Sequence, residues 1–465
     1  MDIYFYNTLT KRKEKFEPIN KEEIKMYSCG PTVYCYAHIG NLRAYLFMDT
    51  LRRVLKYNGY KLKHVMNITD VGHLTSDADE GEDKMMKAAK RENKNPWEIA
   101  DFYTKIFLED MNKLNIDIPE IIARATEHID VMEEYVKKII ENGYTYKTED
   151  TIYFDTSKLP NYGILSGKKV DEQKAGARVD FDENKKNISD FALWIKAPKE
   201  HIMQWDSFFG KCYPGWHLEC SAMGYKYLGE QFDIHTGGID HIPIHHENEI
   251  AQAQGFSGKI PANFWMHVNF LKVNGGKMSK SLNNLYTLDD LKEKGYEPEV
   301  YRMFNFSSTY RNAINFTWEG LEANKKAIVK LKEGYQKHLE GTEDIADEVI
   351  NEFEEKFHQA INDDLNMPLA MSVVWDVIKV STKSKKLADL LLKFDTVLGL
   401  KIAKPMIDSK NNNDEIPEEV KALAEQRKLA RESKNWAESD RLRDEILNLG
   451  YSVKDTKEGY ELTRI

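Results

Sequence analysis

One strand–helix–strand pattern constrains the fold more than any other feature of this chain. Residues 25–34 read as a strand, residues 38–57 as an amphipathic helix and residues 61–68 as a second strand. Such a unit is typical of a parallel sheet, in which ligands bind at the carboxyl ends of the strands. Cys29-Gly30-Pro31-Thr32 and Thr69-Asp70 lie at these ends, so both stretches are predicted to face the ligand.

Two short stretches more than two hundred residues apart indicate a nucleotide site. His38-Ile39-Gly40-Asn41 opens the predicted helix, whose N-terminal amides attract phosphate. Lys277-Met278-Ser279-Lys280-Ser281 follows a Gly-Gly pair, and its two ammonium groups can neutralise charge that develops in phosphoryl or nucleotidyl transfer. Each stretch alone is more often an ordinary helix cap or a solvated loop.

A concentration of histidines suggests a metal site. Six of the thirteen histidines lie between His217 and His267. Residues 244–254 are predicted to be helical, so His245 and Glu249, four residues apart, share one face. Together with thiolates they suit a tetrahedral zinc site. Spacing alone leaves the alternative open that Cys220 is a small buried apolar residue and that the histidines are structural.

The length of 465 residues implies several domains. We expect the first half of a Rossmann-like α/β catalytic domain in residues 1–119, an inserted connective domain in 120–207 that opens with a helix over 123–142, the second catalytic half in 208–286, a helical bundle in 287–404, a polar linker in 405–417 and a small C-terminal domain in 418–465.

Composition excludes several classes of protein. The chain has no apolar run near the roughly 20 residues that a membrane helix needs, and no basic, apolar leader, so we expect no membrane contact and a cytoplasmic location. A formal charge of −10 argues against a protein that coats nucleic acid non-specifically. Four cysteines in a chain of this length are not a disulfide framework.

Five further stretches carry a resemblance to a known family. They are Cys29-Gly30-Pro31-Thr32-Val33-Tyr34, Asn67-Ile68-Thr69-Asp70, Gly215-Trp216-His217-Leu218-Glu219-Cys220, Phe232-Asp233-Ile234-His235-Thr236-Gly237-Gly238 and His245-His246-Glu247-Asn248-Glu249. In this order they resemble the motifs of cysteinyl-tRNA synthetases. The two nucleotide stretches resemble the HIGH and KMSKS signatures of class I aminoacyl-tRNA synthetases, with Asn41 in place of the second histidine.

The resemblance implies a set of site residues. A zinc ion, one per subunit, would be held by Cys29, Cys220, His245 and Glu249. L-Cysteine is expected to contact Gly30, Thr69 and Trp216. ATP, with Mg²⁺, is expected to contact His38, Asn41, Gly238, Asp240 and Lys280, and the expected catalytic residues are Lys280, Lys277 and His38.

The implied activity is ATP-dependent formation of cysteinyl-adenylate and transfer of the cysteinyl group to tRNA(Cys). Residues 437–444 resemble part of the family's anticodon-binding domain, which favours tRNA as the partner of residues 418–465. We expect a monomer. His73 and the acidic run at 77–83 receive no role.

Two alternative functions remain open. An enzyme that joins cysteine to an amino sugar would share the catalytic half but would not need an RNA-binding domain, and residues 418–465 argue against it. A non-catalytic RNA-binding paralogue should have lost a lysine of the second nucleotide stretch or a zinc ligand. None of these residues is lost.

Overall fold

The computed structural model describes residues 1–72, 84–167, 184–199, 201–278, 282, 284–404, 417–433, 435–456 and 459–464. The chain divides into two compact units, residues 1–404 and residues 405–465. His73 and the acidic run at 77–83 lie outside the described residues, as do Ser279, Lys280 and Ser281. Within the described part of the chain, every helix is too short or too polar to cross a membrane.

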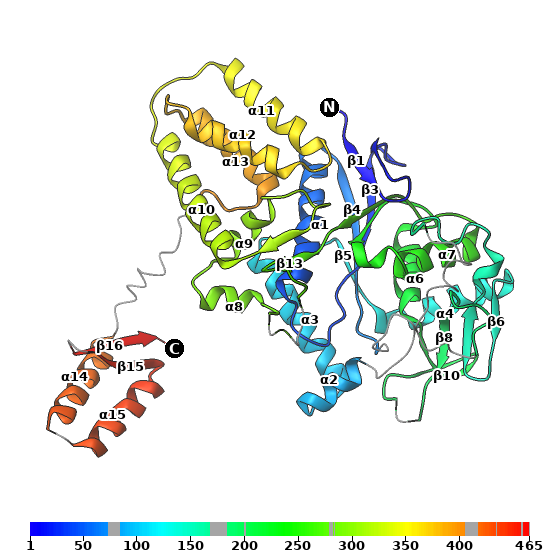
Figure 1. Cartoon of the computed structure of the whole chain (residues 1–465), viewed down its shortest axis with the longest axis horizontal. Helices are drawn as coiled ribbons and strands as arrows, with labels where there is room; N and C mark the ends of the chain where they lie inside the picture. Colours follow the sequence, from blue (N-terminus) through cyan, green and yellow to red (C-terminus); the bar gives the residue numbers. More distant parts are fainter. Residues whose placement is uncertain are drawn as a thin grey trace. The chain divides into compact units, whose positions relative to one another are not determined.

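A parallel sheet of five strands forms the centre of the first unit (Figure 1). In spatial order the strands are β12 (Ala262–Val268), β11 (Phe232–Gly238), β3 (Glu23–Ser28), β4 (Lys61–Ile68) and β5 (Ile121–Arg124). Ile24, Met26 and Val65 are fully buried, as expected for strands that are covered on both faces. The chain leaves β3 toward β4 on one side and later returns to β11 on the other. The crevice beyond the ends of β3 and β11 is therefore the topological switch point, where ligands bind in such sheets.

Helices cover the two faces of this sheet. Helix α1 (Ile39–Tyr57) packs on β4, β11 and β12, whereas α6 (Trp216–Leu228) packs on β3 and β4 from the other side (Figure 1). Among the described residues, this region also contains the helices α2 (Lys84–Glu92), α3 (Pro96–Lys113), α4 (Ile129–Glu141) and α7 (His245–Ser257) and the short η1 (Ala125–Glu127), η2 (Thr156–Lys158) and η3 (Ile239–His241).

An antiparallel sheet of five strands follows the first half of the parallel sheet in the chain. Its spatial order is β6 (Thr145–Lys147), β7 (Thr151–Phe154), β8 (Phe191–Lys196), β10 (Gly210–Pro214) and β9 (Trp205–Ser207). Helix α4 packs against α6 and α7, so this region shares a core with the parallel sheet.

Two predicted elements need correction. The strand predicted over 25–34 ends at Ser28, because the chain then turns out of the sheet at Cys29–Pro31. The helix predicted from residue 123 begins only at Ile129, since residues 121–124 form β5 and pair with β4. The parallel sheet thus reaches past residue 120, and the antiparallel sheet reaches past residue 207 because β10 pairs with β8.

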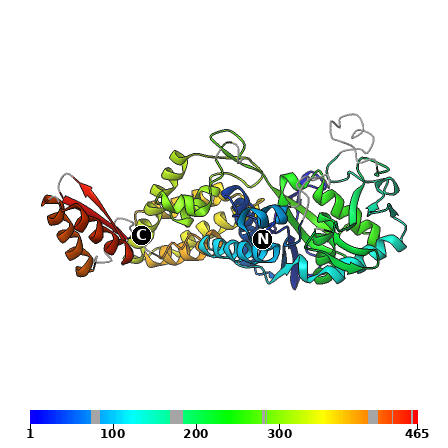
Figure 2. The same cartoon turned by 90° about the horizontal axis from the view of Figure 1, so that it is seen from below.

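A helical region completes the first unit. It consists of α8 (Leu288–Glu293), α9 (Pro298–Asn305), α10 (Trp318–Leu339), α11 (Asp347–Asn362), α12 (Met367–Lys379) and α13 (Lys385–Leu398). Two strand pairs adjoin it, β1 (Tyr4–Asn7) with β2 (Arg12–Lys15) and β13 (Leu271–Val273) with β14 (Ile314–Phe316). Within the first unit, α10–α13 and the antiparallel sheet lie on opposite sides of the parallel sheet (Figures 1 and 2).

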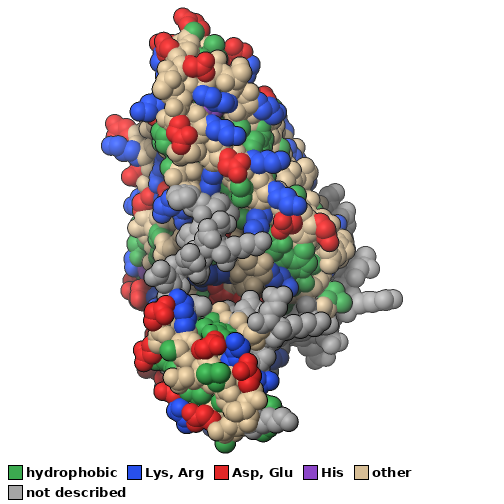
Figure 3. All heavy atoms as spheres, turned by 90° about the vertical axis from the view of Figure 1, so that its left-hand side faces the viewer, with side chains coloured by type: hydrophobic (Ala, Val, Ile, Leu, Met, Phe, Trp, Pro, Cys, Tyr) green, Lys and Arg blue, Asp and Glu red, His purple; other side chains and the backbone are tan. Residues whose placement is uncertain are grey.

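A buried arginine of α9 joins this helical region to α1. The Arg302 side chain is fully buried and donates to Asp49 of α1 and to the carbonyls of Leu398 and Leu114. On the outer side of α10–α13, Lys and Arg side chains are interspersed with Asp and Glu (Figure 3). The visible described surface of these helices therefore offers no broad basic area.

The second unit contains two helices and a hairpin. These are α14 (Glu418–Glu432), α15 (Trp436–Asn448), β15 (Tyr451–Thr456) and β16 (Gly459–Arg464). Val420, Ala424, Ile446 and Tyr451 form its small core. The predicted fold class is confirmed: a parallel-sheet α/β domain, a helical region and a small C-terminal unit.

Candidate active site and metal centre

The two predicted nucleotide stretches meet at the N-terminus of α1. His38 is the N-cap of this helix: its ring Nδ1 accepts from the Asn41 amide, and Asn41 Oδ1 accepts from the His38 amide, both at 3.2 Å. The Ile39 amide donates to the Tyr286 carbonyl, just beyond the second stretch. A Cβ on Gly40 would lie 3.2 Å from the sulfur of Met278. Residues far apart in the sequence therefore lie within contact distance.

A cavity of about 630 Å³ opens at this junction. This volume is typical of a small-molecule site. Gly30, His38, Asn41, Trp216 and Asp240 line it, together with Lys84 and Met278. Lys277 lies beside Met278, while Lys280 is outside the described residues.

Two predicted contact residues lie outside this lining. Thr69 is buried, and its hydroxyl donates to Glu219 at 2.7 Å while its backbone pairs with Pro31 and Val33. Gly238 precedes Asp240, whose Oδ1 would be 2.3 Å from a Cβ at residue 238. Glycine at 238 therefore allows the Asp240 side chain to fold back toward the end of β11.

Gly30 forms the tightest backbone approach at the edge of the sheet. A Cβ at this position would lie 1.6 Å from the carbonyl oxygen of Asn67, and the Gly30 amide donates to the Asn67 side chain at 2.7 Å. The loop after β3 can thus lie directly against the end of β4 only with glycine here.

Replacing Gly30 with alanine should lower the free energy of unfolding by at least about 1–3 kcal/mol, the usual cost of overpacking, because backbone must move. Urea denaturation monitored by circular dichroism measures this change. Gly224→Ala, within helix α6, is the matched control, since a Cβ there makes only ordinary contacts, with Tyr27 at 3.5 Å and Phe232 at 3.9 Å. A Gly30→Ala protein as stable as this control would contradict the steric argument.

Four metal-binding side chains converge beside the cavity. Donor atoms of Cys29, Cys220, His245 and Glu249 all lie within 4.8 Å of one another. The two sulfurs are 3.8 Å apart, and His245 Nε2 is 3.1 Å from Glu249 Oε1. Two sulfur ligands of a tetrahedral zinc, each at about 2.3 Å, would be about 3.8 Å apart. The donor types and their separations therefore fit a zinc ion.

A second set of donors overlaps the first. Cys29 and Glu249 also lie within 4.8 Å of donor atoms of His235 and His246. His246, however, is held on its other ring nitrogen by His267 at 2.7 Å, and His235 Nε2 bonds Glu249 Oε2 at 2.8 Å. The first set is the better zinc site because it supplies two thiolates, which suit this metal.

The comparisons with known proteins decide the family. Residues 15–326 match the family described as tRNA synthetases class I (C) catalytic domain, and residues 413–461 match the cysteinyl-tRNA ligase anticodon binding domain. The chain belongs to the cysteinyl-tRNA synthetase family. A cysteine–tRNA ligase 1 of Burkholderia lata is 44% identical over 467 residues, covering 99% of this chain and 97% of the relative. A cysteine–tRNA ligase of Treponema denticola is 42% identical over 482 residues, covering 98% of each.

Solved structures share the fold of this synthetase. The methionyl-tRNA synthetase of Mycobacterium tuberculosis in complex with methionyl-adenylate aligns with a TM-score of 0.56 at 14% identity, over 82% of this chain and 90% of that one. At this identity the likeness concerns the fold alone.

The four side chains of the donor cluster shift one another's pKa values. Burial raises the pKa of the Cys29 thiol, and Cys220 and Glu249 raise it further. Burial would also raise the pKa of Cys220, but hydrogen bonds with Cys29 and His245 bring it to about 7. Burial opposes the charge on His245, yet Cys220 and Glu249 raise its pKa to about 10. A divalent cation bound here would displace the protons of Cys29 and His245.

Glu249 is the best-anchored member of the cluster. Burial would raise the pKa of its carboxyl, but His235 and His245 hold that pKa well below the usual range. His217 Nδ1 lies 2.9 Å from His245 Nδ1 and orients that ring from behind. The sequence did not predict that His217, His235 and His246 contact the proposed metal ligands. His217 and His235 lie far in the chain from the residues they contact, His245 and Glu249. His246 directly follows a predicted ligand.

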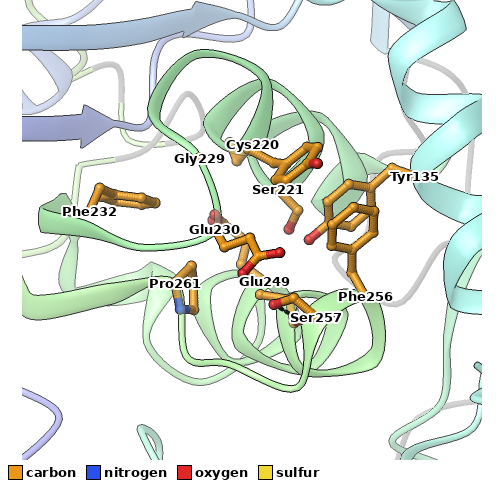
Figure 4. A pocket seen from close by; sticks show the side chains of 12 residues that line it. Tyr135, Cys220, Ser221, Gly229, Glu230, Phe232, Glu249, Phe256, Ser257 and Pro261 are labelled. Atoms are coloured by element: carbon orange, nitrogen blue, oxygen red, sulfur yellow. Dashed lines mark hydrogen bonds between the residues drawn. The ribbon is translucent and has the colours of Figure 1, made fainter.

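A much smaller cavity lies beside Cys220 and Glu249 (Figure 4). Cys220 and Glu249 line it together with Tyr135, Glu230 and Phe256, and its volume is about 20 Å³. That is room for about one water and excludes an amino acid. The larger cavity, lined by Gly30 and Trp216, has room for an amino acid.

Proposed function

We propose that this chain is a cysteine–tRNA ligase that activates L-cysteine with ATP and transfers it to tRNA(Cys). The observation that carries the proposal is the placement of a two-thiol donor cluster beside the nucleotide cavity. Trp216 links the two: it lines the cavity, and its ring centroid is 4.5 Å from that of His245.

The cap of α1 supplies two hydrogen-bond donors to the nucleotide. Because His38 Nδ1 accepts from the Asn41 amide, its proton is on Nε2, which is left to donate to a phosphate or ribose oxygen. Burial lowers the pKa of His38, so the ring is neutral near pH 7. Asn41 Oδ1 is used by the His38 amide, and its Nδ2 remains as the second donor.

In the first step the cysteine carboxylate attacks the α-phosphorus of ATP and pyrophosphate leaves. Lys277 and Lys280 are proposed to stabilise the charge that develops on the phosphate oxygens, with Mg²⁺ accompanying ATP. Asp240 and Gly238, at the end of β11, are proposed to bind the adenosine. In the second step a terminal ribose hydroxyl of the tRNA takes the cysteinyl group and AMP leaves.

Recognition of the cysteine side chain is proposed to depend on Cys29, Cys220, His245 and Glu249. A zinc ion held by these residues supplies a soft Lewis acid for the substrate thiolate. Trp216 covers His245, and Gly30 allows the substrate to approach the sheet edge closely. Thr69 is proposed to support the cysteine site indirectly, through the hydrogen bond that its hydroxyl donates to Glu219.

Cysteine-dependent exchange of pyrophosphate into ATP tests the first step. We expect exchange with L-cysteine and a rate with L-serine that is lower by roughly 10⁴, as for sites that demand a specific polar partner. Exchange that proceeds equally with both amino acids would contradict the assignment of the donor cluster.

Deleting residues 417–465 should separate the two steps. This segment forms a unit of its own with its own small core, so the catalytic unit is expected to keep cysteine-dependent pyrophosphate exchange. Charging of tRNA should fall by at least about tenfold, because one substantial set of contacts is lost. Both activities are measured on the same preparation. Normal charging by the truncated enzyme would refute an RNA-binding role for this segment.

A further inference from the structure

An exposed aromatic pair lies at the mouth of the large cavity. Tyr36, in the loop before α1, is 48% exposed, and Phe102, on α3, is 37% exposed. Their ring centroids are 6.5 Å apart, and both rings pack edge-on against the buried Tyr103, at 5.2 and 5.1 Å. Tyr36 and Tyr103 line the cavity, whereas Phe102 lies outside its lining. We call Tyr36 and Phe102 the aromatic platform.

A basic segment borders this platform. Residues 84–94 contain five basic residues and one acidic residue, in a chain whose formal charge is −10. Lys84 lines the cavity, and Arg91 donates to the carbonyl of Tyr34 in the platform's loop at 3.2 Å. Lys94 Nζ lies 4.3 Å from the Phe102 ring centroid. Lys87, Lys90 and Arg91 are exposed.

The one acidic residue of this segment pairs with two of its five basic residues, and the segment keeps a net positive charge. Glu92 lies 2.6 Å from Arg91 and 3.9 Å from Lys94, and it accepts from the Tyr103 hydroxyl at 2.6 Å. It therefore fixes α2 against α3 and the platform's base. The interspersed charges on α10–α13 (Figure 3) offer no comparable concentration on the described surface that is visible there.

We propose that the aromatic platform and the basic residues of 84–94 bind the single-stranded 3′ end of the tRNA as it enters the active site. Exposed aromatic faces beside a line of positive charge are the general means of holding single-stranded nucleic acid, with bases stacked on the rings and phosphates along the cations. The inference rests on the proposed function, because the second step requires a terminal ribose to reach this cavity.

ATP is a poorer occupant of the platform than RNA. Phe102 lies outside the cavity that the α1 cap and Met278 border, so a nucleotide held at those residues does not need it. Tyr36 lines the cavity, and the exposed Phe102 ring lies against it, so a strand that enters from solvent on this side passes both rings. The platform is therefore expected to serve the transfer step and not the activation step.

The decisive variant is Phe102→Ala. Pyrophosphate exchange should continue at the wild-type rate, while the KM for tRNA in charging should rise at least about fivefold, the effect of losing one stacked base. Phe102→Tyr should restore charging. Phe208→Ala is the matched control: Phe208 is 45% exposed with Lys137 5.2 Å from its ring centroid, yet it lies between β9 and β10, outside the cavity lining. It should leave both activities unchanged.

Direct binding separates this inference from the proposed function. An RNA hairpin with a single-stranded 3′ overhang should bind wild-type enzyme more tightly than the same hairpin with a blunt end, and Phe102→Ala should abolish the difference. Equal binding of the two hairpins, an unchanged KM for tRNA in Phe102→Ala, or loss of exchange in that variant would each overturn the inference. Failure of the proposed function would instead appear as absent cysteine-dependent exchange in the wild-type enzyme.

Discussion

Replacing Cys220 with serine is expected to reduce bound zinc and cysteine activation together. The cluster would lose one of its two sulfurs, which lie 3.8 Å apart, and the anionic donor whose pKa is about 7. Discrimination of cysteine from serine, expected at roughly 10⁴, should then fall toward the 10–200-fold that size alone provides. Metal analysis of the purified protein and pyrophosphate exchange with each amino acid measure the two effects.

Cys212 provides the matched control. It is a fully buried cysteine on β10 and is absent from both candidate ligand sets among the described residues. Cys212→Ser should cost some stability but keep zinc and selectivity. The far-ultraviolet circular dichroism of Cys220→Ser should stay native, because the parallel sheet buries its own apolar core. A Cys220→Ser enzyme that retains zinc and rejects serine as the wild type does would remove Cys220 from the site.

Replacing Lys280 with alanine is expected to slow adenylate formation by about 10²–10³, since one preorganised charge at a phosphoryl centre contributes about 2.7–4 kcal/mol to the transition state. The KM for cysteine should change little, because the cysteine residues and Trp216 are untouched. Steady-state exchange over a range of cysteine and ATP concentrations separates these two parameters.

Lys356→Ala is the control for this experiment. Lys356 is an exposed lysine on α11 that pairs only locally with Glu352, so its removal should not affect exchange. If Lys280→Ala exchanges pyrophosphate as fast as this control, Lys280 has no part in the chemistry, and the charge must come from Lys277 or from Mg²⁺ alone.

Local patterns in the sequence were sufficient for the central part of the fold. Strand β4 has the predicted bounds, residues 61–68, and α1 begins at Ile39, one residue after the predicted start at His38. Strand β5 was missed because four residues next to a helical pattern carry little periodicity, and only pairing with β4 makes them a strand. Pairing across the chain is not encoded in such a short segment.

The site shows the same division between local and long-range information. The spacing of His245 and Glu249 predicted that both face one side of α7, and they lie 3.1 Å apart. Nothing in the spacing could bring Cys29 to Cys220, because that contact depends on how α6 packs on β3. Nor could it reveal that His246 approaches Cys29 at 3.2 Å, which makes a second donor set conceivable.

Charging of total tRNA with each amino acid in turn, in the presence of ATP and zinc, tests the central claim most directly. The account predicts that cysteine is attached, that serine is attached at a rate lower by roughly 10⁴, and that every other amino acid is rejected. Attachment of another amino acid at a rate comparable to that of cysteine, or no attachment of cysteine by enzyme that contains zinc, would contradict it.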